Sequence, residues 1–174
     1  GRHPEYYSED PILTGTLMAY QARGLEENGV IATYKHLIAN NMEFERKSAH
    51  GIIDENTLRD LYLRVFDKAF SLYKPGCVMT SYNPVNGIYP CENSALLNDL
   101  LRGEWGFDGF VMTDWGSYDT ADSIRSVCAG TNLLTPGSKK HFRMILKAVK
   151  RNEISKAALQ HSVKQIVKVL VRCI

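Results

Sequence analysis

Asp114 is the side chain in this sequence that is best placed to do chemistry. It follows residues 110–113, a short run of apolar and β-favouring residues that predicts a strand buried on both faces. Ligands of α/β folds collect at the carboxyl ends of the strands, so a carboxylate at that point indicates a binding or catalytic site. The competing interpretation is that Asp114 only caps the next helix, a position where Asp is common.

Polar residues also end two other predicted strands. Lys35 and His36 close the strand predicted at residues 30–36, and Tyr82 closes the one at residues 77–82. Each has an ordinary explanation when taken alone: a surface lysine, a core histidine and a packed tyrosine. In a parallel sheet, however, right-handed crossovers put the carboxyl ends of all strands on one side. We therefore expect these side chains to converge with the carboxylate after the third strand.

Strands and helices alternate along the whole chain. Strands are predicted at residues 30–36, 77–82, 110–113 and 131–134, and helices at residues 11–28, 54–74, 95–104, 119–128, 139–150 and 155–171. This alternation is typical of βαβ units around a parallel sheet. The predicted strands are too few for a closed (β/α)8 barrel, which takes about 250 residues. The α/β chain is therefore either an open sheet or the later part of a barrel.

Composition and charge exclude several function classes. The 174 residues carry a formal net charge of +2 with no long basic block, which gives no case for a nucleic-acid or membrane-surface partner. No apolar run approaches the roughly 20 residues that a membrane-spanning helix needs. The cysteines lack the pairing and the nearby histidines of a zinc site, so we expect no metal. Cys77 and Cys128 lie in apolar surroundings that predict buried thiols.

Longer motifs run through the chain. They are Gly1-Arg-x-x-Glu-Tyr-Tyr-Ser-Glu-Asp-Pro11, Lys35-His-Leu-Ile-Ala-Asn-Asn-Met-Glu43, Met79-Thr-Ser-Tyr-Asn-Pro-Val-Asn-Gly87, Glu104-Trp-Gly-Phe-Asp-Gly-Phe-Val-Met-Thr-Asp-Trp-Gly116 and Ala129-Gly-Thr-Asn-Leu-Leu-Thr-Pro-Gly137. In this order they resemble the catalytic barrel domain of glycoside hydrolase family 3, in its β-glucosidase-like branch. The likeness covers essentially the whole chain, and it implies the later part of a (β/α)8-type, TIM-like barrel, as a single partial domain over residues 1–174.

The resemblance also implies a role for the polar strand ends. In that family the Asp of the (Ser/Thr)-Asp-Trp motif is the nucleophile of a retaining β-glycosidase, which maps onto Asp114. The sugar-binding residues of the family map onto Arg2, Lys35, His36, Tyr82 and Trp115. We therefore expect hydrolysis of a small β-glucoside or oligosaccharide substrate by double displacement, without a cofactor or a metal.

These residue types suit that chemistry. A carboxylate close beneath the anomeric carbon stabilises an oxocarbenium-like transition state and then forms the covalent intermediate. Asp114 must be ionised for this, and Lys35, Arg2 and Tyr82 could supply the positive and hydrogen-bonding neighbours. An aromatic ring such as Trp115 offers an apolar face to the C–H groups of a sugar ring.

The chain also departs from the family pattern. Asn132 stands where the family usually has Asp, and Thr135 stands where it often has Met; they lie on and directly after the last predicted strand. The family's barrel begins before Gly1 and includes an aspartate that binds distal sugar hydroxyls, and its acid/base glutamate comes from a separate domain after the barrel. We therefore nominate no acid/base residue and expect a missing barrel segment and a C-terminal domain as partners. The isolated chain should have negligible glycosidase activity.

Two other functions remain as alternatives to a β-glycosidase, and the role of three residues is also open. A non-catalytic carbohydrate-binding or interaction module would keep the same sugar-facing residues without performing a reaction. A phosphate-binding α/β enzyme fits less well, because the chain lacks the glycine-rich loop of such sites. At a finer level, Asn41, Glu43 and Arg46 match family positions behind the sugar site, where holding the long loop is an equally strong interpretation.

Overall fold

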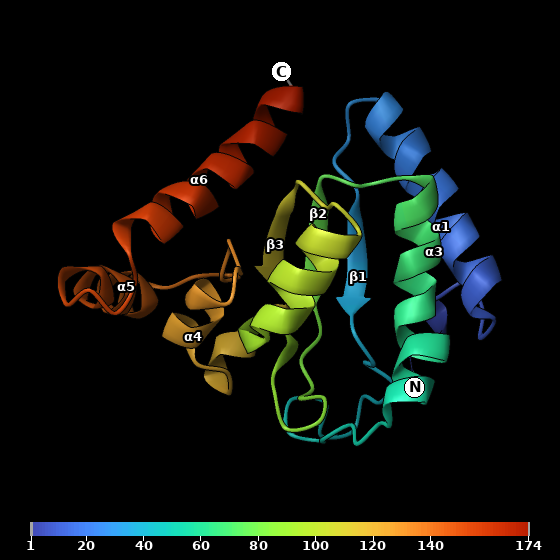
Figure 1. The fold of residues 1–174 in the computed structure, drawn as a ribbon, viewed down its shortest axis with the longest axis horizontal. Helices are drawn as coiled ribbons and strands as arrows, with labels where there is room; N and C mark the ends of the chain where they lie inside the picture. Colours follow the sequence, from blue (N-terminus) through green and yellow to red (C-terminus); the bar gives the residue numbers. More distant parts are fainter. Residues whose placement is uncertain (1, 174) are drawn as a thin grey trace.

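The computed structural model describes residues 2–173, so that Gly1, which opens the first motif, lies outside the described residues. The elements follow in the order η1 (His3–Glu5), α1 (Pro11–Glu27), β1 (Thr33–Leu37), α2 (Glu55–Thr57), η2 (Leu58–Leu63), α3 (Arg64–Leu72), β2 (Cys77–Thr80), η3 (Pro90–Glu92), η4 (Ala95–Glu104), β3 (Phe110–Thr113), η5 (Ser117–Asp119), α4 (Ser123–Cys128), α5 (Lys139–Lys150), α6 (Lys156–Leu170) and η6 (Val171–Cys173). Figure 1 shows their arrangement.

The strands form one parallel sheet in the order β1-β2-β3. β2 and β3 pair in register from Cys77 opposite Phe110 onward, whereas the register of β1 on β2 shifts between Tyr34 and Leu37. All three strands point the same way, and their carboxyl ends meet at the lower edge of the sheet in Figure 1. The predicted parallel α/β arrangement is therefore confirmed.

The first long helix begins where the sequence predicts. Asp10 Oδ1 accepts the N–H groups of Ile12 at 2.8 Å and Leu13 at 3.0 Å, and a proline occupies the first helical position. Gly15 lets α1 approach α3 closely, because a Cβ atom at this position would lie 2.5 Å from the carbonyl oxygen of Val65. The two helices consequently pack side by side next to β1 (Figure 1).

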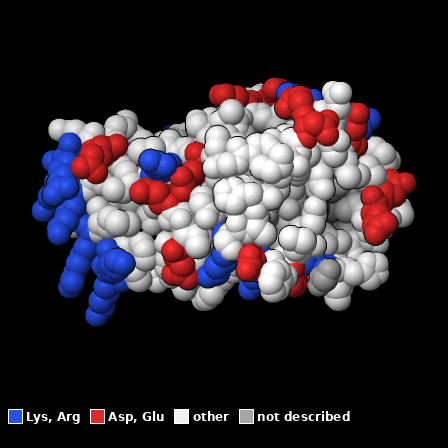
Figure 2. Space-filling model, turned by 90° about the horizontal axis from the view of Figure 1, so that it is seen from below, with Lys and Arg blue, Asp and Glu red and all other residues white. Residues whose placement is uncertain are grey.

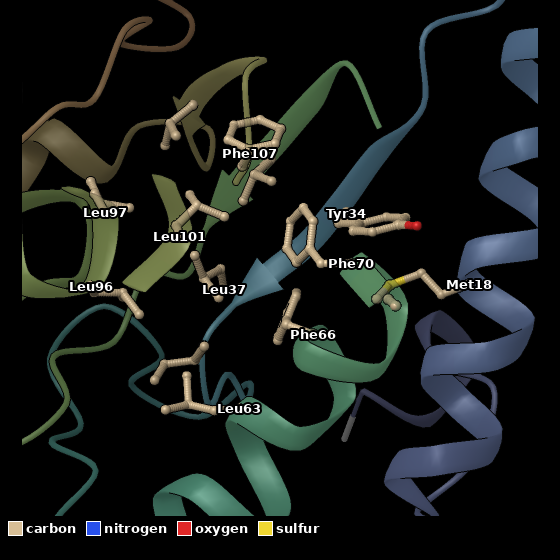
Figure 3. Close-up of a cluster of buried hydrophobic side chains, with 14 of the residues drawn as sticks. Met18, Tyr34, Leu37, Leu63, Phe66, Phe70, Leu96, Leu97, Leu101 and Phe107 are labelled. Atoms are coloured by element: carbon tan, nitrogen blue, oxygen red, sulfur yellow. The ribbon is translucent and has the colours of Figure 1, made fainter. Parts of the chain in front are cut away.

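The main hydrophobic core lies between the sheet and the helices α1, α3 and η4 (Figure 3). The ring of Phe70 lies 5.3 Å from the rings of Tyr34 and Trp105 and 5.7 Å from that of Phe107. The fully buried leucines of this core are Leu37, Leu97 and Leu101. Burying one such side chain stabilises the fold by about 1.5–3 kcal/mol. The core therefore fixes the strands relative to one another, and with them the positions of their carboxyl ends.

One predicted helix starts later than the sequence suggests. The helix expected at residues 119–128 begins only at Ser123, as α4. Asp122 caps it by accepting the N–H groups of Ile124 at 2.8 Å and Arg125 at 2.9 Å. The separate short helical turn η5, Ser117–Asp119, lies before this cap. The helix expected at residues 54–74 is present as a continuous helical stretch, whose middle section η2 is π-helical.

The strand predicted at residues 131–134 is wrong as a regular element, since only a single bridge joins Leu133 to Met112. Asn132 gives the reason. Its Oδ1 atom accepts the Val111 N–H at 2.7 Å, so that a side chain replaces a backbone ladder bond. The same oxygen accepts from Arg102 at 2.9 Å, which ties this segment to η4.

Of the two predictions of buried cysteines, one is confirmed and one is wrong. Cys77 is buried as predicted, but Cys128 is exposed. The helix α4 turns Ser123 and Ser126 inward, followed by Ala129 just beyond its end, and this three-residue spacing leaves Cys128 on the outer side. Cys77, Cys91 and Cys128 are all free thiols, and the side chain of Cys173 lies outside the described part of the chain.

Figure 2 views the edge where the carboxyl ends of the strands meet. The middle of this face is largely uncharged, and basic side chains gather at the end of the molecule where α5 lies. The exposed basic residues of α5 are Lys139, Lys140, Arg143, Lys147 and Lys150. Within residues 2–173, no helix has the length and apolar character to cross a bilayer, and no group of at least three His, Cys, Asp or Glu side chains could hold a metal ion.

Candidate active site

Asp114 directly follows β3 and lies at the carboxyl edge of the sheet, with 12% of its side chain exposed. Its Oδ2 atom lies 3.2 Å from Nε2 of His36, which comes from β1, and its Oδ1 atom accepts the N–H of Trp115 at 2.6 Å. The other ring nitrogen of His36, Nδ1, lies 3.0 Å from the hydroxyl of Tyr6. The carboxylate that follows β3 is therefore held by a side chain from β1, although β1 and β3 are not neighbours in the sheet.

The surroundings of Asp114 favour its ionised form. Burial by itself raises the pKa of this carboxyl group, but hydrogen bonds from His36 and from the Trp115 N–H, together with the charge of His36, oppose that effect and lower the pKa. The pKa of Asp114 is consequently lower than that of an ordinary aspartate, and the group is charged at neutral pH. A buried carboxylate held ionised in this way can act as a nucleophile or as an electrostatic stabiliser of a developing positive charge.

Tyr82, beyond the end of β2, connects the carboxylate to its neighbouring turn. Its hydroxyl donates to the carbonyl oxygen of Trp115 at 2.5 Å. Burial and the negative charge of Asp114 raise the pKa of Tyr82 to about 12, so that the hydroxyl keeps its proton and remains a donor. The guanidinium carbon of Arg46 lies 4.6 Å from the centre of the tyrosine ring, which is a cation–π distance.

A second set of charged residues surrounds Arg2, which is buried although it carries a full charge. Its guanidinium group pairs with Glu5 at 3.0 Å and with Glu43. The ammonium group of Lys35 lies 3.2 Å from Glu5. Arg2, Glu5, Lys35 and His36 line one cavity of about 640 Å³ together with apolar side chains of α1, η2 and α3, and Asp114 is not among the lining residues. Donors and carboxylates arranged around such a cavity can hydrogen-bond the hydroxyl groups of a sugar.

The structure thus places the predicted residues in two groups that share His36. The first, the carboxylate group, contains Asp114, His36, Tyr82 and the backbone of Trp115. The second, the cavity group, contains Arg2, Lys35 and again His36. Lys35 pairs with Glu5 rather than with the carboxylate, and Trp115 is 66% exposed, so its side chain is largely open to solvent.

Glu5 and Tyr6 contact residues of the candidate site, although sequence analysis predicts no role for them. Glu5 lies three residues after Arg2, and this Arg-x-x-Glu spacing was the available signal for an ion pair. Tyr6, which contacts His36, carries no comparable signal, because it follows a short turn without periodicity.

The long connection between β1 and α2 is held by the residues for which two interpretations were open. Asn41 Nδ2 donates to the Tyr62 hydroxyl at 2.8 Å, and Glu43 binds Arg46 at 3.0 Å in addition to Arg2. These are contacts that hold the loop. Because Arg46 also covers the ring of Tyr82, the connection is attached directly to the carboxylate group.

Known proteins resemble the chain over almost its whole length. Residues 1–169 match the sequence model of the glycosyl hydrolase family 3 N-terminal domain. The probable beta-glucosidase J of Aspergillus fumigatus is 39% identical over 173 residues, and the thermostable beta-glucosidase B of Acetivibrio thermocellus is 40% identical over 171 residues. Both alignments cover 98% of this chain but only 20% and 22% of the relatives.

A solved structure agrees with these sequence matches. The structure of beta-glucosidase 3B from Thermotoga neapolitana in complex with glucose matches with a TM-score of 0.93 and 40% identity. This match covers 99% of the chain and 25% of the other protein. The likeness confirms the predicted fold class, an α/β segment of a TIM-like barrel. The chain spans between a fifth and a quarter of the length of the relatives named here.

Proposed function

Because this chain belongs to glycoside hydrolase family 3, we propose that it carries the nucleophile of a retaining β-glucosidase and works as part of a longer enzyme. Relatives named as beta-glucosidases align with 98% of the chain, which supports a β-glucoside as substrate. Their greater length supports additional segments that complete the sugar site. The single observation that carries the proposal is the buried carboxylate of Asp114, kept ionised by His36 at 3.2 Å and by further hydrogen bonds.

In the first displacement, a carboxylate oxygen of Asp114 attacks the anomeric carbon of the glucoside. The bond from that carbon to the glycosidic oxygen breaks, and the departing oxygen takes a proton from a general acid of another segment. His36 and the Trp115 N–H hold the carboxylate oxygens in a fixed geometry, so that little reorganisation accompanies the attack. The product of this step is a glucosyl ester of Asp114.

In the second displacement, water attacks the anomeric carbon of the ester. The residue that gave its proton now takes one from the water, and Asp114 leaves as a carboxylate. The low pKa of Asp114 favours this departure, because the released anion is stabilised by the same hydrogen bonds. Each displacement inverts the anomeric carbon, so glucose is released with the configuration of the substrate.

We assign the binding of sugar hydroxyls to the cavity group. Arg2, Lys35 and His36 line a cavity of about 640 Å³, within the size range of small-ligand sites. Glu5 joins Arg2 to Lys35 and adds carboxylate acceptors. The exposed ring of Trp115, which follows the nucleophile, is available to pack against the C–H face of a sugar.

Replacement of Asp114 by glycine in the longer enzyme tests the proposal. Asp114→Gly should lower the hydrolysis of an aryl β-glucoside by about 10⁴-fold or more, as loss of a covalent nucleophile does elsewhere. Azide should then restore turnover, because the small anion fits the space of the lost carboxylate, and it should yield the glucosyl azide of inverted configuration. Asp108→Asn, at the other end of β3, is the control and should remain active.

Two results would overturn the assignment. Asp114→Gly could retain its hydrolytic rate, or azide could fail to restore turnover in a folded variant. Glucose binding without any hydrolysis by the unaltered enzyme would favour the non-catalytic carbohydrate-binding module instead.

A further inference from the structure

The backbone that follows Asp114 forms a tight turn, residues 114–119, here called the catalytic turn. Ser117 N–H donates to the Asp114 carbonyl oxygen at 3.1 Å, and Gly116 N–H donates to the carbonyl oxygen of Thr135 at 2.8 Å. Gly116 has a φ of +79°, a left-handed conformation that favours glycine. Within the turn, the Asp119 N–H also donates to the Gly116 carbonyl oxygen at 3.1 Å, whereas none of these bonds holds the carbonyl oxygen of Trp115.

Lys47 holds this turn from the other side. Its ammonium group lies 2.9 Å from Asp119 Oδ2 and 3.3 Å from the carbonyl oxygen of Gly116. Lys47 belongs to the long connection between β1 and α2, and the Tyr89 hydroxyl donates to its carbonyl oxygen at 3.3 Å. A lysine that is itself held by a third loop therefore links two segments separated by 72 residues in the sequence.

The link between Lys47 and the turn bears on the orientation of the Trp115 indole. Packing cannot fix the ring, because 66% of the residue is exposed. Its orientation depends on the backbone, which is held at the Trp115 carbonyl by Tyr82 and at the Gly116 carbonyl by the Asp119 N–H and by Lys47. Lys47 also pairs with the Asp119 carboxylate. A Cβ atom on Gly116 would lie only 3.4 Å from the Lys47 ammonium group, which shows how closely the lysine approaches the turn.

We propose that Lys47 is a positioning residue that fixes the catalytic turn through Gly116 and Asp119 and thereby orients Trp115 against the sugar. The proposal rests on the proposed β-glucosidase function. Lys47 acts through geometry, since the carboxylate of Asp114 is already held by His36 and the Trp115 N–H. Its ammonium group contacts the turn and lies 5.5 Å from the centre of the Tyr82 ring, but it touches none of the reacting atoms.

Kinetics of the longer enzyme give the first test. Lys47→Met keeps the apolar stem and removes the ammonium group, and it should raise KM about 3- to 5-fold with kcat within about twofold, the size expected for a partly exposed ion pair. Lys47→Arg should restore much of the loss, because a guanidinium group can still reach Asp119. Asp119→Asn should have a similar effect, and the double variant should be no worse than either single one.

The acidic limb of the pH profile of kcat/KM distinguishes a positioning role of Lys47 from an effect of its charge on Asp114. This limb should lie at the same pH in Lys47→Met and in the unaltered enzyme. A shift of that limb would mean that Lys47 acts on the ionisation of Asp114, and it would overturn the positioning role.

Hydrogen exchange followed by mass spectrometry gives a second test that needs no activity. The amides of residues 116–119 should exchange faster in Lys47→Met. The matched control is Lys168→Met, which breaks another lysine–aspartate pair, with Asp108, and should leave this peptide unchanged. Unchanged exchange in Lys47→Met would overturn the proposal. If the enzyme hydrolyses no glucoside, faster exchange still supports the restraint by Lys47, and the failure then falls on the proposed function.

Discussion

The strand β3 has an aspartate near each end, and the two aspartates are in different situations. Asp108, before the strand, has 56% of its side chain exposed and pairs with Lys168, which is 45% exposed. Asp114, after the strand, has only 12% exposed and faces His36. The pKa is lowered at both sites. At Asp108 the hydrogen bond from Lys168 is the main cause, whereas at Asp114 hydrogen bonds must first overcome the effect of burial.

The difference distinguishes an amino edge of the sheet held by structural contacts from a carboxyl edge that carries the candidate site. At the amino edge, the Glu26 carboxylate accepts the N–H groups of Gly76 at 2.6 Å and Ala32 at 3.1 Å, and so joins α1 to the segments that lead into β1 and β2. At the carboxyl edge, polar groups from several segments surround one buried charge. Burying a charge is costly unless it is well paired, so a perturbed carboxylate there is a functional-site candidate.

The largest contrast should appear in the matched pair Asp114→Asn and Asp108→Asn. Asp114→Asn removes the proposed nucleophile and should lower kcat/KM for an aryl β-glucoside by about 10⁴-fold or more. Asp108→Asn should stay within about twofold, because it removes only an exposed ion pair. Steady-state kinetics of the longer enzyme measure both. Comparable losses in the two variants would contradict the distinction between the two ends of β3.

A smaller effect is expected from His36. His36→Phe removes the donor at Nε2, so the pKa of Asp114 should rise, because burial is then less opposed. The acidic limb of kcat/KM should move to higher pH, and the rate at neutral pH should fall by about 10- to 100-fold, the value of a hydrogen bond to a charged group. His36→Gln, which keeps an N–H donor, is the control. If the acidic limb of kcat/KM lies at the same pH in His36→Phe and His36→Gln, His36 is not the group that keeps Asp114 ionised.

Tyr82→Phe should have a weaker effect still. It removes the hydrogen bond to the Trp115 carbonyl oxygen and leaves the ring beneath Arg46 in place. We expect kcat/KM to fall by about 2- to 10-fold, the value of one neutral hydrogen bond. The free energy of unfolding should change little, which urea titration can check. A loss as large as that of Asp114→Asn would mean that Tyr82 has a direct role in the chemistry.

The smallest effect should come from the amino edge. Asp108→Asn should lower the free energy of unfolding by about 0.2–1 kcal/mol at neutral pH, as for other exposed ion pairs. The folded-state pKa of Asp108 is lowered, so this contribution is present above the pKa of the unfolded chain and is lost as the pH falls through the folded value. The unfolding curves of Asp108→Asn and of the unaltered protein should therefore differ at neutral pH and coincide at strongly acidic pH. A difference that persists in acid would exclude the ion pair as its source.

Much of this arrangement follows from sequence patterns. The apolar run before Asp114 predicts β3, and the parallel order of the strands predicts that His36 and Asp114 meet, as they do at 3.2 Å. The start of α1 follows from Asp10, whose carboxylate caps the helix. In these cases, local preference and the long-range packing lead to the same structure.

Other features depend on contacts that a single sequence does not encode locally. Asn132 breaks the expected fourth strand because its side chain bonds to Val111, and nothing in the β-prone run signals that choice. The ion pair of Lys47 with Asp119 spans 72 residues and appears only once the loops are folded. Lys35 was expected beside the carboxylate but instead pairs with Glu5, since the short turn η1 brings that glutamate to it.

Covalent trapping tests the role of Asp114 most directly. An activated 2-deoxy-2-fluoro-β-glucoside slows the second displacement, so a sugar ester should accumulate on the nucleophile. Peptide mass spectrometry of the longer enzyme should find one added fluoroglucosyl group on Asp114, and none on that peptide in Asp114→Asn. A label on another carboxylate, or steady hydrolysis with no trapped ester, would contradict the assignment.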